Sequence, residues 1–392
     1  MSPTVGTGLD FLEKAWPRHL ADARVGLLVH PASINSRFEH AVDICRRSRK
    51  FVLKALFGPQ HGIRGETQDN MIEWEGFRDK KTGLAVYSLY GKTRKPAPSM
   101  LRDIDVMMID VQDVGSRYYT FIWTLSLVME ACKDLAAAVV VLDRPNPIGG
   151  HMVEGPVLNP KFKSFVGLHE LPVRHGMTMG EISHYLKDIF YQDLDLHVVP
   201  IRGWKRNMWF DDTKLPWVYP SPNMPTIDTA IVYPGMCLLE GTNLSEGRGT
   251  TRPFEVFGAP FVDPETLIKR LCEFRLRGVF FRPMYFLPTF QKYAGKICGG
   301  AQIHVTDREK YSPFKTAVAV IKAVRELCPG NFAWKKPPYE YEEVLLPIDI
   351  LAGTNRLRED IENGIDLRKM ESWWSAESKD FDKKSRRKYL LY

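Results

Sequence analysis

The sequence predicts an α/β fold with an open, mostly parallel sheet, because two kinds of segment alternate along its first half. The first kind is a short, nearly continuous apolar run bounded by turn residues, which is typical of a strand buried on both faces. The second is a longer amphipathic segment such as Tyr118–Leu135, whose bulky apolar residues repeat at helical spacing. Alternation of this kind indicates a parallel sheet covered by helices. The expected strands, in chain order, are Val25–Val29, Phe51–Phe57, Val106–Ile109, Ala138–Leu142 and His197–Ile201.

Polar loops follow three of these expected strands. Gly58–Glu66 follows the second strand, Asp110–Arg117 the third and Asp143–Gly150 the fourth. Ligands of open parallel sheets bind in the crevice beyond the carboxyl ends of the strands. The sequence therefore predicts a polar site at this edge of the sheet.

A second domain is expected after a proline-rich stretch. From about Trp204 the chain changes character, and four prolines between residues 216 and 225 exclude a regular helix or a central strand there. Further along, the short run Gln302–Val305 and the helical segment Pro313–Glu326 indicate an α+β domain. We therefore expect one domain at residues 1–228 and a smaller α+β domain at residues 229–392.

Composition excludes several classes of protein. With 44% hydrophobic and 26% charged residues, the 392-residue chain is neither disordered nor fibrous. The net charge of +7 is spread along the chain, so no nucleic acid partner is required, and we interpret the basic stretch Lys383–Lys388 as a solvated helix end. The start of the chain lacks a secretory pattern and no long apolar run occurs, so we expect a cytoplasmic protein with no membrane contact. Its oligomeric state is not predicted.

Several well-known catalytic motifs are absent. No strand-to-helix turn carries the GxGxxG of dinucleotide-binding proteins, and GxSxG is missing. Gly91-Lys92-Thr93 ends like a phosphate-binding loop but lacks the earlier glycine, since position 86 is Val. The six cysteines form no CxxC pair, which favours free thiols over a zinc or redox site.

Carboxylates, arginines and amides on glycine-rich loops remain as candidates. The segment Glu240–Glu255 is the densest, and its arginines can bind a carboxylate or phosphate while its glycines allow close approach of a ligand. The alternative is a structural loop with internal ion pairs. For Asp110 and Asp113 the alternative is helix capping, with Arg117 as counter-ion.

These loops, taken together, resemble the exo-β-N-acetylmuramidase family of peptidoglycan glycoside hydrolases, formerly a domain of unknown function. The resemblance extends over essentially the whole chain. It is carried by LFGPQHGIRGE (Leu56–Glu66), VYSLYG (Val86–Gly91), DVQDVGSRYYT (Asp110–Thr120), LDRPNPIGG (Leu142–Gly150), EGP (Glu154–Pro156), HGMTMGE (His175–Glu181), PSPNMPT (Pro220–Thr226), YPGMCLLEGTNLSEGRGTTRPFE (Tyr233–Glu255), IHVTDR (Ile303–Arg308) and the closing YLLY.

The resemblance implies a Rossmann-like catalytic domain, a C-terminal auxiliary domain and a cleft between them. It also implies release of N-acetylmuramic acid from the non-reducing end of peptidoglycan fragments, with no cofactor and no metal. Glycoside hydrolysis needs one acid for the leaving oxygen and a second group that acts as nucleophile or activates water. Glu66 is the candidate acid, and Asp110 or Asp113 the candidate partner. The candidate substrate-binding residues are Gln60, His61, Arg64, Asn223, Asn243, Glu246 and Arg248.

One position departs from the family pattern. Many members resemble this chain but carry a glutamate where it has Gln60, and an amide cannot donate a proton as a carboxylic acid does. Either the acid lies elsewhere, for example at Glu66, Asp69, Glu73 or Glu75, or the substrate differs. Arg64 and Arg248 are our candidates for contacting the lactyl carboxylate of the sugar.

Two other functions stay open at this point. A non-catalytic muramyl-sugar-binding protein on the same fold is compatible with Gln60. A metal- or phosphate-dependent hydrolase is a weaker alternative, since aspartates at strand ends also bind magnesium.

Overall fold

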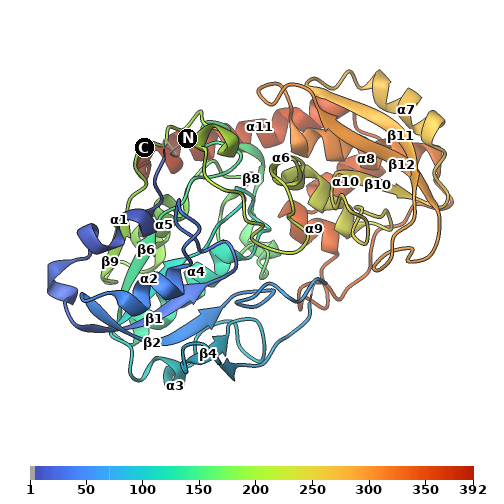
Figure 1. Cartoon of the computed structure of the whole chain (residues 1–392). Helices are drawn as coiled ribbons and strands as arrows, with labels where there is room; N and C mark the ends of the chain where they lie inside the picture. Colours follow the sequence, from blue (N-terminus) through green and yellow to red (C-terminus); the bar gives the residue numbers. More distant parts are fainter. Residues whose placement is uncertain (1–4, 70) are drawn as a thin grey trace.

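In the computed structural model, which describes residues 5–69 and 71–392, two layered bodies lie side by side (Figure 1). The first contains a seven-stranded sheet in the order β3-β4-β2-β1-β5-β6-β9. Only β3 pairs antiparallel with its neighbour, so the predicted mostly parallel α/β sheet is confirmed. Its strands are β1 (Ala23–Val29), β2 (Phe51–Gly58), β3 (Phe77–Arg78), β4 (Ala85–Ser88), β5 (Val106–Asp110), β6 (Ala138–Leu142) and β9 (Leu196–Val199).

The five strands predicted from apolar runs all form, with ends within two residues of the prediction. The prediction missed β3 and β4, which lie at one edge of the sheet. Side chains of β4 alternate between buried and half-buried, and β3 has no buried residue. An edge strand has no continuous apolar run because only part of it faces the core.

Helices cover both faces of this sheet. In β5, Val106 and Met108 pack into the core beneath α1 and α2, whereas Met107 and Ile109 pack into the core beneath α4 and α5. Successive side chains of a strand point to opposite faces, which explains why these runs are apolar throughout. The four helices are α1 (Gly8–Ala15), α2 (Ala41–Arg47), α4 (Phe121–Asp134) and α5 (Met179–Phe190).

The second body is an α+β arrangement around an antiparallel sheet in the order β10-β12-β11. Its strands are β10 (Val256–Ala259), β11 (Val279–Phe286) and β12 (Cys298–Val305). The helices of this half are α6 (Ile227–Met236), α7 (Pro264–Glu273), α8 (Pro313–Leu327), α9 (Pro347–Ala352) and α10 (Arg356–Glu362). The remaining elements are α3 (Pro98–Leu101), β7 (Glu154–Val157), β8 (Pro172–Arg174), α11 (Leu367–Lys384), η1 (Arg18–Leu20), η2 (Pro160–Phe162), η3 (Phe210–Thr213), η4 (Cys237–Gly241) and η5 (Arg386–Lys388).

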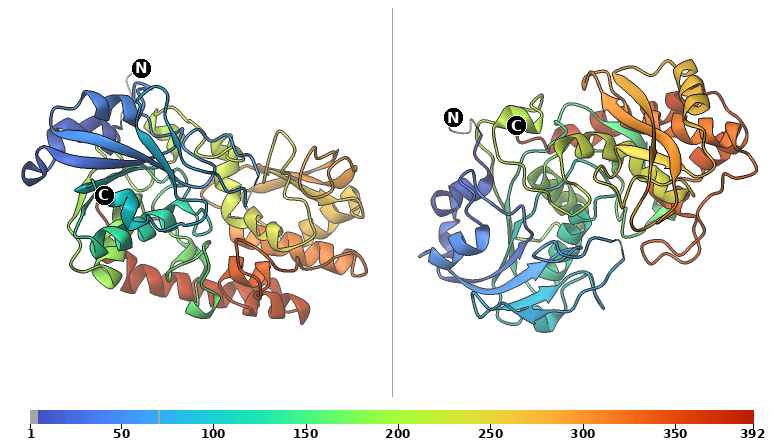
Figure 2. Two further views of the ribbon diagram at one scale, coloured as in Figure 1. Left: turned by 90° about the horizontal axis from the view of Figure 1, so that it is seen from below. Right: turned by 45° about the vertical axis from the view of Figure 1, so that its right-hand side comes forward.

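The long helix α11 returns from the second body to the first and lies beneath both of them (Figure 2, left). Ser378 Oγ donates to the carbonyl of Gly155 in β7 at 2.6 Å. Beyond the helix, Arg386 donates to the carbonyl of Gly150 at 2.7 Å and is buried. The basic stretch Lys383–Lys388 therefore contains one residue that is packed against the first body rather than solvated.

Two general features of the described residues complete the fold. No helix among them has the length and apolar character needed to cross a membrane. All six cysteines are free thiols, of which four are buried and Cys272 is exposed.

Candidate active site

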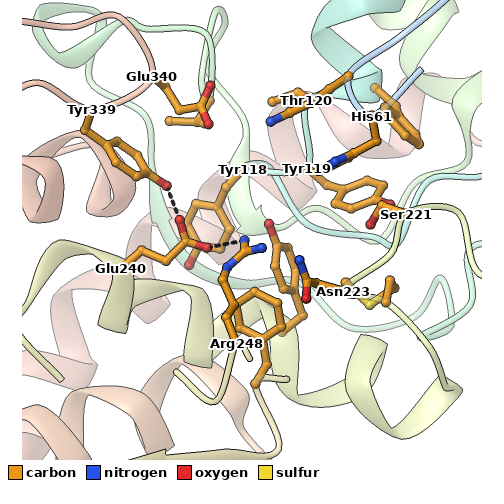
Figure 3. A pocket seen from close by; sticks show the side chains of 16 residues that line it. His61, Tyr118, Tyr119, Thr120, Ser221, Asn223, Glu240, Arg248, Tyr339 and Glu340 are labelled. Carbon is orange, nitrogen blue, oxygen red and sulfur yellow. Dashed lines mark hydrogen bonds and ion pairs between the residues drawn. The ribbon is translucent and has the colours of Figure 1, made fainter. Parts of the chain in front are cut away.

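A pocket lies where loops after β2 and β5 meet loops of the second body (Figure 3). Both β2 and β5 pair with β1, so these loops leave the sheet at its carboxyl edge, where the sequence predicted a site. The lining residues are Gln60, His61, Tyr118, Tyr119, Thr120, Phe121, Val166, Ser221, Asn223, Met224, Tyr233, Glu240, Arg248, Phe254, Tyr339 and Glu340.

The pocket is narrow. Its cavity volume is about 30 Å³, which is room for about two water molecules and is far below the roughly 300 Å³ of a small-molecule site. A sugar ring can enter only if lining side chains move apart. Glu340 and the neighbouring Tyr341 are in the left-handed backbone region, with φ of 45° and 68°, which non-glycine residues adopt at a free-energy cost.

The first loop places His61 in the wall. His61 has a φ of 70°, and its Nδ1 donates to the carbonyl of Thr67 at 2.6 Å. Burial lowers the pKa of His61 to about 4, so the ring is neutral at pH 7. Because Nδ1 carries the proton, Nε2 is a hydrogen-bond acceptor.

Gln60 is the middle of a hydrogen-bonded chain that crosses the pocket wall. Thr120 Oγ1 donates to Gln60 Oε1 at 2.7 Å, and Gln60 Nε2 donates to the hydroxyl of Tyr90 at 3.2 Å. The Tyr90 hydroxyl in turn donates to Glu340 Oε2 at 2.9 Å. This chain joins the loop after β2, the turn before α4 and the segment between α8 and α9.

A buried charge cluster forms the opposite wall. Arg248 Nη2 donates to Glu240 Oε1 at 2.7 Å, and its Nε lies 3.4 Å from Glu246 Oε1. Lys292 Nζ lies 3.0 Å from Glu246 Oε2, so two cations face two carboxylates. The Tyr339 hydroxyl donates to the second oxygen of Glu240 at 2.8 Å.

The two carboxyl groups that line the pocket differ in acidity. Burial raises the pKa of Glu240, but the attraction of Arg248 and the hydrogen bonds from Arg248 and Tyr339 outweigh burial and hold that pKa below its ordinary value. Burial raises the pKa of Glu340 to about 7, assisted by repulsion from Glu240. One carboxyl group is therefore ionised at neutral pH, while the other keeps its proton to a higher pH than an ordinary glutamate does.

Aromatic rings form the floor of the pocket. Tyr233 packs edge-on against Tyr118 and Tyr119, with ring centroids 6.1 and 5.8 Å apart. Phe254 lies 4.8 Å from Tyr233 in the same manner, and the Arg248 guanidinium lies over its ring at 5.0 Å. Aromatic surfaces of this kind suit the apolar face of a ring-shaped ligand.

The structure brings four of the predicted site residues into this pocket, and Glu246 lies directly behind it. Gln60, His61, Asn223 and Arg248 line the pocket, and all four side chains are buried. Asn223 is held by a hydrogen bond from its Nδ2 to the carbonyl of Gln68 at 2.7 Å.

Three other predicted residues lie outside the pocket. Glu66 is exposed on the loop after β2. Arg64 is also exposed, where it lies 3.5 Å from Asp79 and over the ring of Phe77. Asn243 bridges the backbone of the segment 331–333, so its amide supports the loop rather than the pocket.

The two predicted aspartates are both buried and neither lines the pocket. Asp110 forms a bidentate ion pair with Arg144, at 2.6 and 2.9 Å. Asp113 accepts from the backbone of Gly115 at 2.6 Å and lies 3.2 Å from His175 Nε2. Polar residues do end these strands as predicted, but in this structure they contact each other.

Sequence reasoning missed Glu240, Tyr339 and Glu340. Glu240 begins the segment Glu240–Glu255 that was singled out, so its signal was present but was assigned to Glu246 and Arg248 instead. Tyr339 and Glu340 lie in no recognised motif, and only their long-range hydrogen bonds identify them.

One group of described residues outside the pocket has metal-ligand chemistry. His19, Asp195 and His197 lie at the edge of the seven-stranded sheet, with His197 Nε2 2.8 Å and His19 Nε2 3.3 Å from the Asp195 carboxylate. Two of these side chains are exposed, and the group contributes nothing to the pocket.

Comparison with known proteins gives consistent matches over the whole chain. Residues 25–228 match the N-terminal and residues 231–392 the C-terminal domain described as exo-beta-N-acetylmuramidase NamZ. The chain is 46% identical over 390 residues to the peptidoglycan beta-N-acetylmuramidase NamZ of Bacillus subtilis (strain 168), covering 100% of this chain and 92% of that protein.

Two solved structures are also similar, and both are DUF1343 family proteins from Bacteroides fragilis. One has a TM-score of 0.89 at 35% identity, and the other a TM-score of 0.76 at 29% identity. In each case the similarity covers 99% of both chains.

Proposed function

The chain belongs to the exo-beta-N-acetylmuramidase NamZ family, and from this we infer that it is an exo-acting glycoside hydrolase that releases N-acetylmuramic acid from the non-reducing end of peptidoglycan fragments. The resemblance found in the sequence motifs is thereby confirmed at the level of the family. The site and the role of each residue are our proposals.

The observation that carries the proposal for the site is the pair of buried carboxyl groups in a pocket built by both halves of the chain. Glu240 and Glu340 both line it, and their pKa values are shifted in opposite directions. Glycoside hydrolysis uses two carboxyl groups in different protonation states, and environments that separate their pKa values distinguish the two roles. We propose that the chain divides into a domain of residues 1–228 and a domain of residues 229–392, with the cleft between them. In this arrangement residues 229–392 supply both carboxyl groups, and residues 1–228 supply the wall that contains Gln60, His61 and Asn223.

Glu240 suits the role of the ionised group. Its carboxylate is fixed by Arg248 and Tyr339, so its position is defined before substrate binds. A negative charge held there would stabilise the positive charge that develops at the anomeric carbon.

The remaining lining residues suit recognition of the sugar. Arg248 is the cation among the described lining residues and is placed to attract the lactyl carboxylate that distinguishes muramic acid from glucosamine. Gln60, His61 and Asn223 offer hydrogen-bonding groups for the acetamido and hydroxyl substituents, and Tyr233 offers an apolar surface.

A hydrolysis assay tests this function. We expect the protein to release the chromophore from an aryl β-N-acetylmuramide and not from the matching β-N-acetylglucosaminide. Glu240→Gln should lower kcat/KM by at least about 10²-fold, because it removes the fixed charge from the transition state. Glu66→Gln is the matched control, since Glu66 is exposed and outside the pocket, and its activity should equal that of the unmodified protein.

The competing function is binding of muramyl sugars without cleavage, which Gln60 brought into consideration. Measurable binding of N-acetylmuramic acid with no release from either glycoside would establish it and would overturn the hydrolase proposal. Activity that survives in Glu240→Gln would keep the hydrolase but remove Glu240 from the mechanism.

A further inference from the structure

Glu340 is the second of the two buried carboxyl groups that line the pocket, and its own part in the reaction is still to be assigned. It lies in the segment between α8 and α9, and its side chain enters the pocket from a different part of the chain than that of Glu240 (Figure 3). Only 4% of the residue is exposed, so water does not freely solvate the group. A buried carboxyl group that faces a ligand pocket is a candidate for proton transfer.

A hydrogen bond from the Tyr90 hydroxyl orients the Glu340 carboxyl group, and two further hydrogen bonds lead from Thr120 through Gln60 to Tyr90. The donors run in one direction, from Thr120 to Gln60, from Gln60 to Tyr90 and from Tyr90 to the Glu340 carboxyl group. Gln60 uses its carbonyl and its amino group within this chain and has no acidic proton. The group at the end of the chain, Glu340, is the one that can carry such a proton.

Charged and titratable groups surround Glu340 on several sides. Tyr90 and Arg94 approach it from the loop after β4, Glu240 from η4 and Arg248 from the loop that follows η4. Burial and Glu240 favour the protonated form, whereas Tyr90, Arg94 and Arg248 favour the ionised form. Burial dominates, and the lactyl carboxylate of a bound substrate would add a further negative charge that favours protonation.

We propose that Glu340 is the general acid of the reaction, the residue that protonates the departing glycosidic oxygen. This inference rests on the proposed function. As the bond between the anomeric carbon and the glycosidic oxygen breaks, its electron pair stays on that oxygen, which takes the proton of the Glu340 carboxyl group. A water molecule then forms the new bond to the anomeric carbon, and the proton that it loses restores the carboxyl group, so the enzyme is unchanged after one turnover.

Two substrates that differ in leaving group test this role. A general acid matters most when the leaving oxygen is a poor leaving group, such as the 4-hydroxyl of N-acetylglucosamine, and least when it is a nitrophenolate, which departs without a proton. For Glu340→Gln we expect kcat/KM on the disaccharide of N-acetylmuramic acid and N-acetylglucosamine to fall by about 10²- to 10⁴-fold. On the 4-nitrophenyl muramide the loss should stay below about 10-fold.

The matched control is Glu343→Gln, which removes an exposed carboxylate three residues further along the same segment. It should hydrolyse both substrates as the unmodified protein does. Thermal unfolding of each variant shows whether it is folded.

A second variant tests the same inference without removing the acid. Tyr90→Phe deletes the hydroxyl that donates to Glu340 and stabilises its ionised form, so the pKa of Glu340 should rise. The fall of kcat/KM on the disaccharide at alkaline pH should therefore move to higher pH in this variant. A purely structural role for Tyr90 would lower activity at every pH without moving this limb.

The outcomes separate the two proposals. If the unmodified protein releases muramic acid from neither substrate, the proposed function fails. If the unmodified protein is active but Glu340→Gln lowers kcat/KM equally on the two substrates, or lowers it on neither, Glu340 is not the acid. If Glu340→Gln does not fold, an alkaline limb that stays in place in Tyr90→Phe would overturn the inference.

Discussion

Replacing Asp110 with asparagine tests whether this carboxylate supports the fold or takes part in the reaction. Asp110 is fully buried at the end of β5, and both of its oxygens accept from Arg144, at 2.6 and 2.9 Å. Arg144 is itself only 5% exposed, so the variant would leave its positive charge buried and partly unpaired. If the carboxylate is structural, stability should fall while activity of the folded enzyme is retained.

The size of the effect follows from this geometry. Breaking a buried ion pair by removing one partner costs about 3–5 kcal/mol. Asparagine keeps one acceptor oxygen for the guanidinium, so we expect the lower end, about 3 kcal/mol. At about 1–2 °C per kcal/mol for a chain of 392 residues, Tm should fall by about 3–6 °C.

Thermal unfolding and hydrolysis of an aryl muramide, both measured on the same preparation, check this expectation. Below the unfolding transition, kcat/KM should stay within about threefold of the unmodified protein, since Asp110 does not line the pocket. Asp103→Asn is the control, because Asp103 pairs with Arg24 on the surface and should leave Tm within about 1 °C. An unchanged Tm together with a loss of activity of 10²-fold or more would refute the reasoning and return Asp110 to the reaction.

Three further predictions concern packing, the pocket and pH. Gly235→Ala places a Cβ 1.9 Å from the carbonyl oxygen of Pro313 and should lower the free energy of unfolding by at least about 1–3 kcal/mol. In the control Gly330→Ala the new Cβ meets no atom within 4 Å, so the free energy of unfolding should stay unchanged. Equal Tm values for the two variants would contradict this prediction. Tyr339→Phe removes a hydrogen-bond donor to Glu240, so the pKa of Glu240 should rise. The acidic limb of the pH profile of kcat/KM should then move to higher pH, and a limb that stays in place would exclude Glu240 as the ionised group. Burial raises the pKa of Asp143 to about 6 in the folded protein, above its value of about 4 in the unfolded chain. The folded state therefore holds this proton more tightly, which adds to the free energy of unfolding at low pH. That contribution is lost as pH rises from about 4 to about 6. Urea unfolding should show the unmodified protein losing about 2–3 kcal/mol over that range relative to Asp143→Asn, and parallel pH profiles would contradict the assignment.

The sequence predicted the sheet well because buried strands have a purely local signature. Each run such as Ala138–Leu142 is apolar on both faces, so its composition alone identifies it. The edge strand β4 alternates in burial over only four residues, which is too short to stand out from a loop. Helix α4 was predicted because its apolar repeat extends over 14 consecutive residues. The hairpin of β7 and β8 was not predicted, because these strands have only four and three residues and are recognised by their pairing.

The site was predicted only in part, for a related reason. Gln60 and His61 follow a strand, and the sheet topology places that loop at the carboxyl edge of the sheet, where it lines the pocket. Glu340 reaches the same pocket from 250 residues beyond its hydrogen-bond partner Tyr90, a contact that no local pattern encodes. Asp110 was predicted as a site residue because it is a carboxylate at the end of β5. Arg144 follows the neighbouring strand β6 and forms an ion pair with that carboxylate, which the sequence pattern did not reveal.

Helix α11 has a consequence for how this chain can be divided or recombined. The helix belongs to the C-terminal family segment, yet it is bonded to the hairpin of the N-terminal segment through Ser378 and Gly155, and Phe381 packs edge-on against Tyr185 of α5. A fragment that ends at residue 228 would leave those surfaces uncovered in water. A chimera that joins the two halves of different relatives would need a hairpin and a helix that fit each other. Substitutions on the two sides of this contact between α11 and the first body are therefore expected to covary.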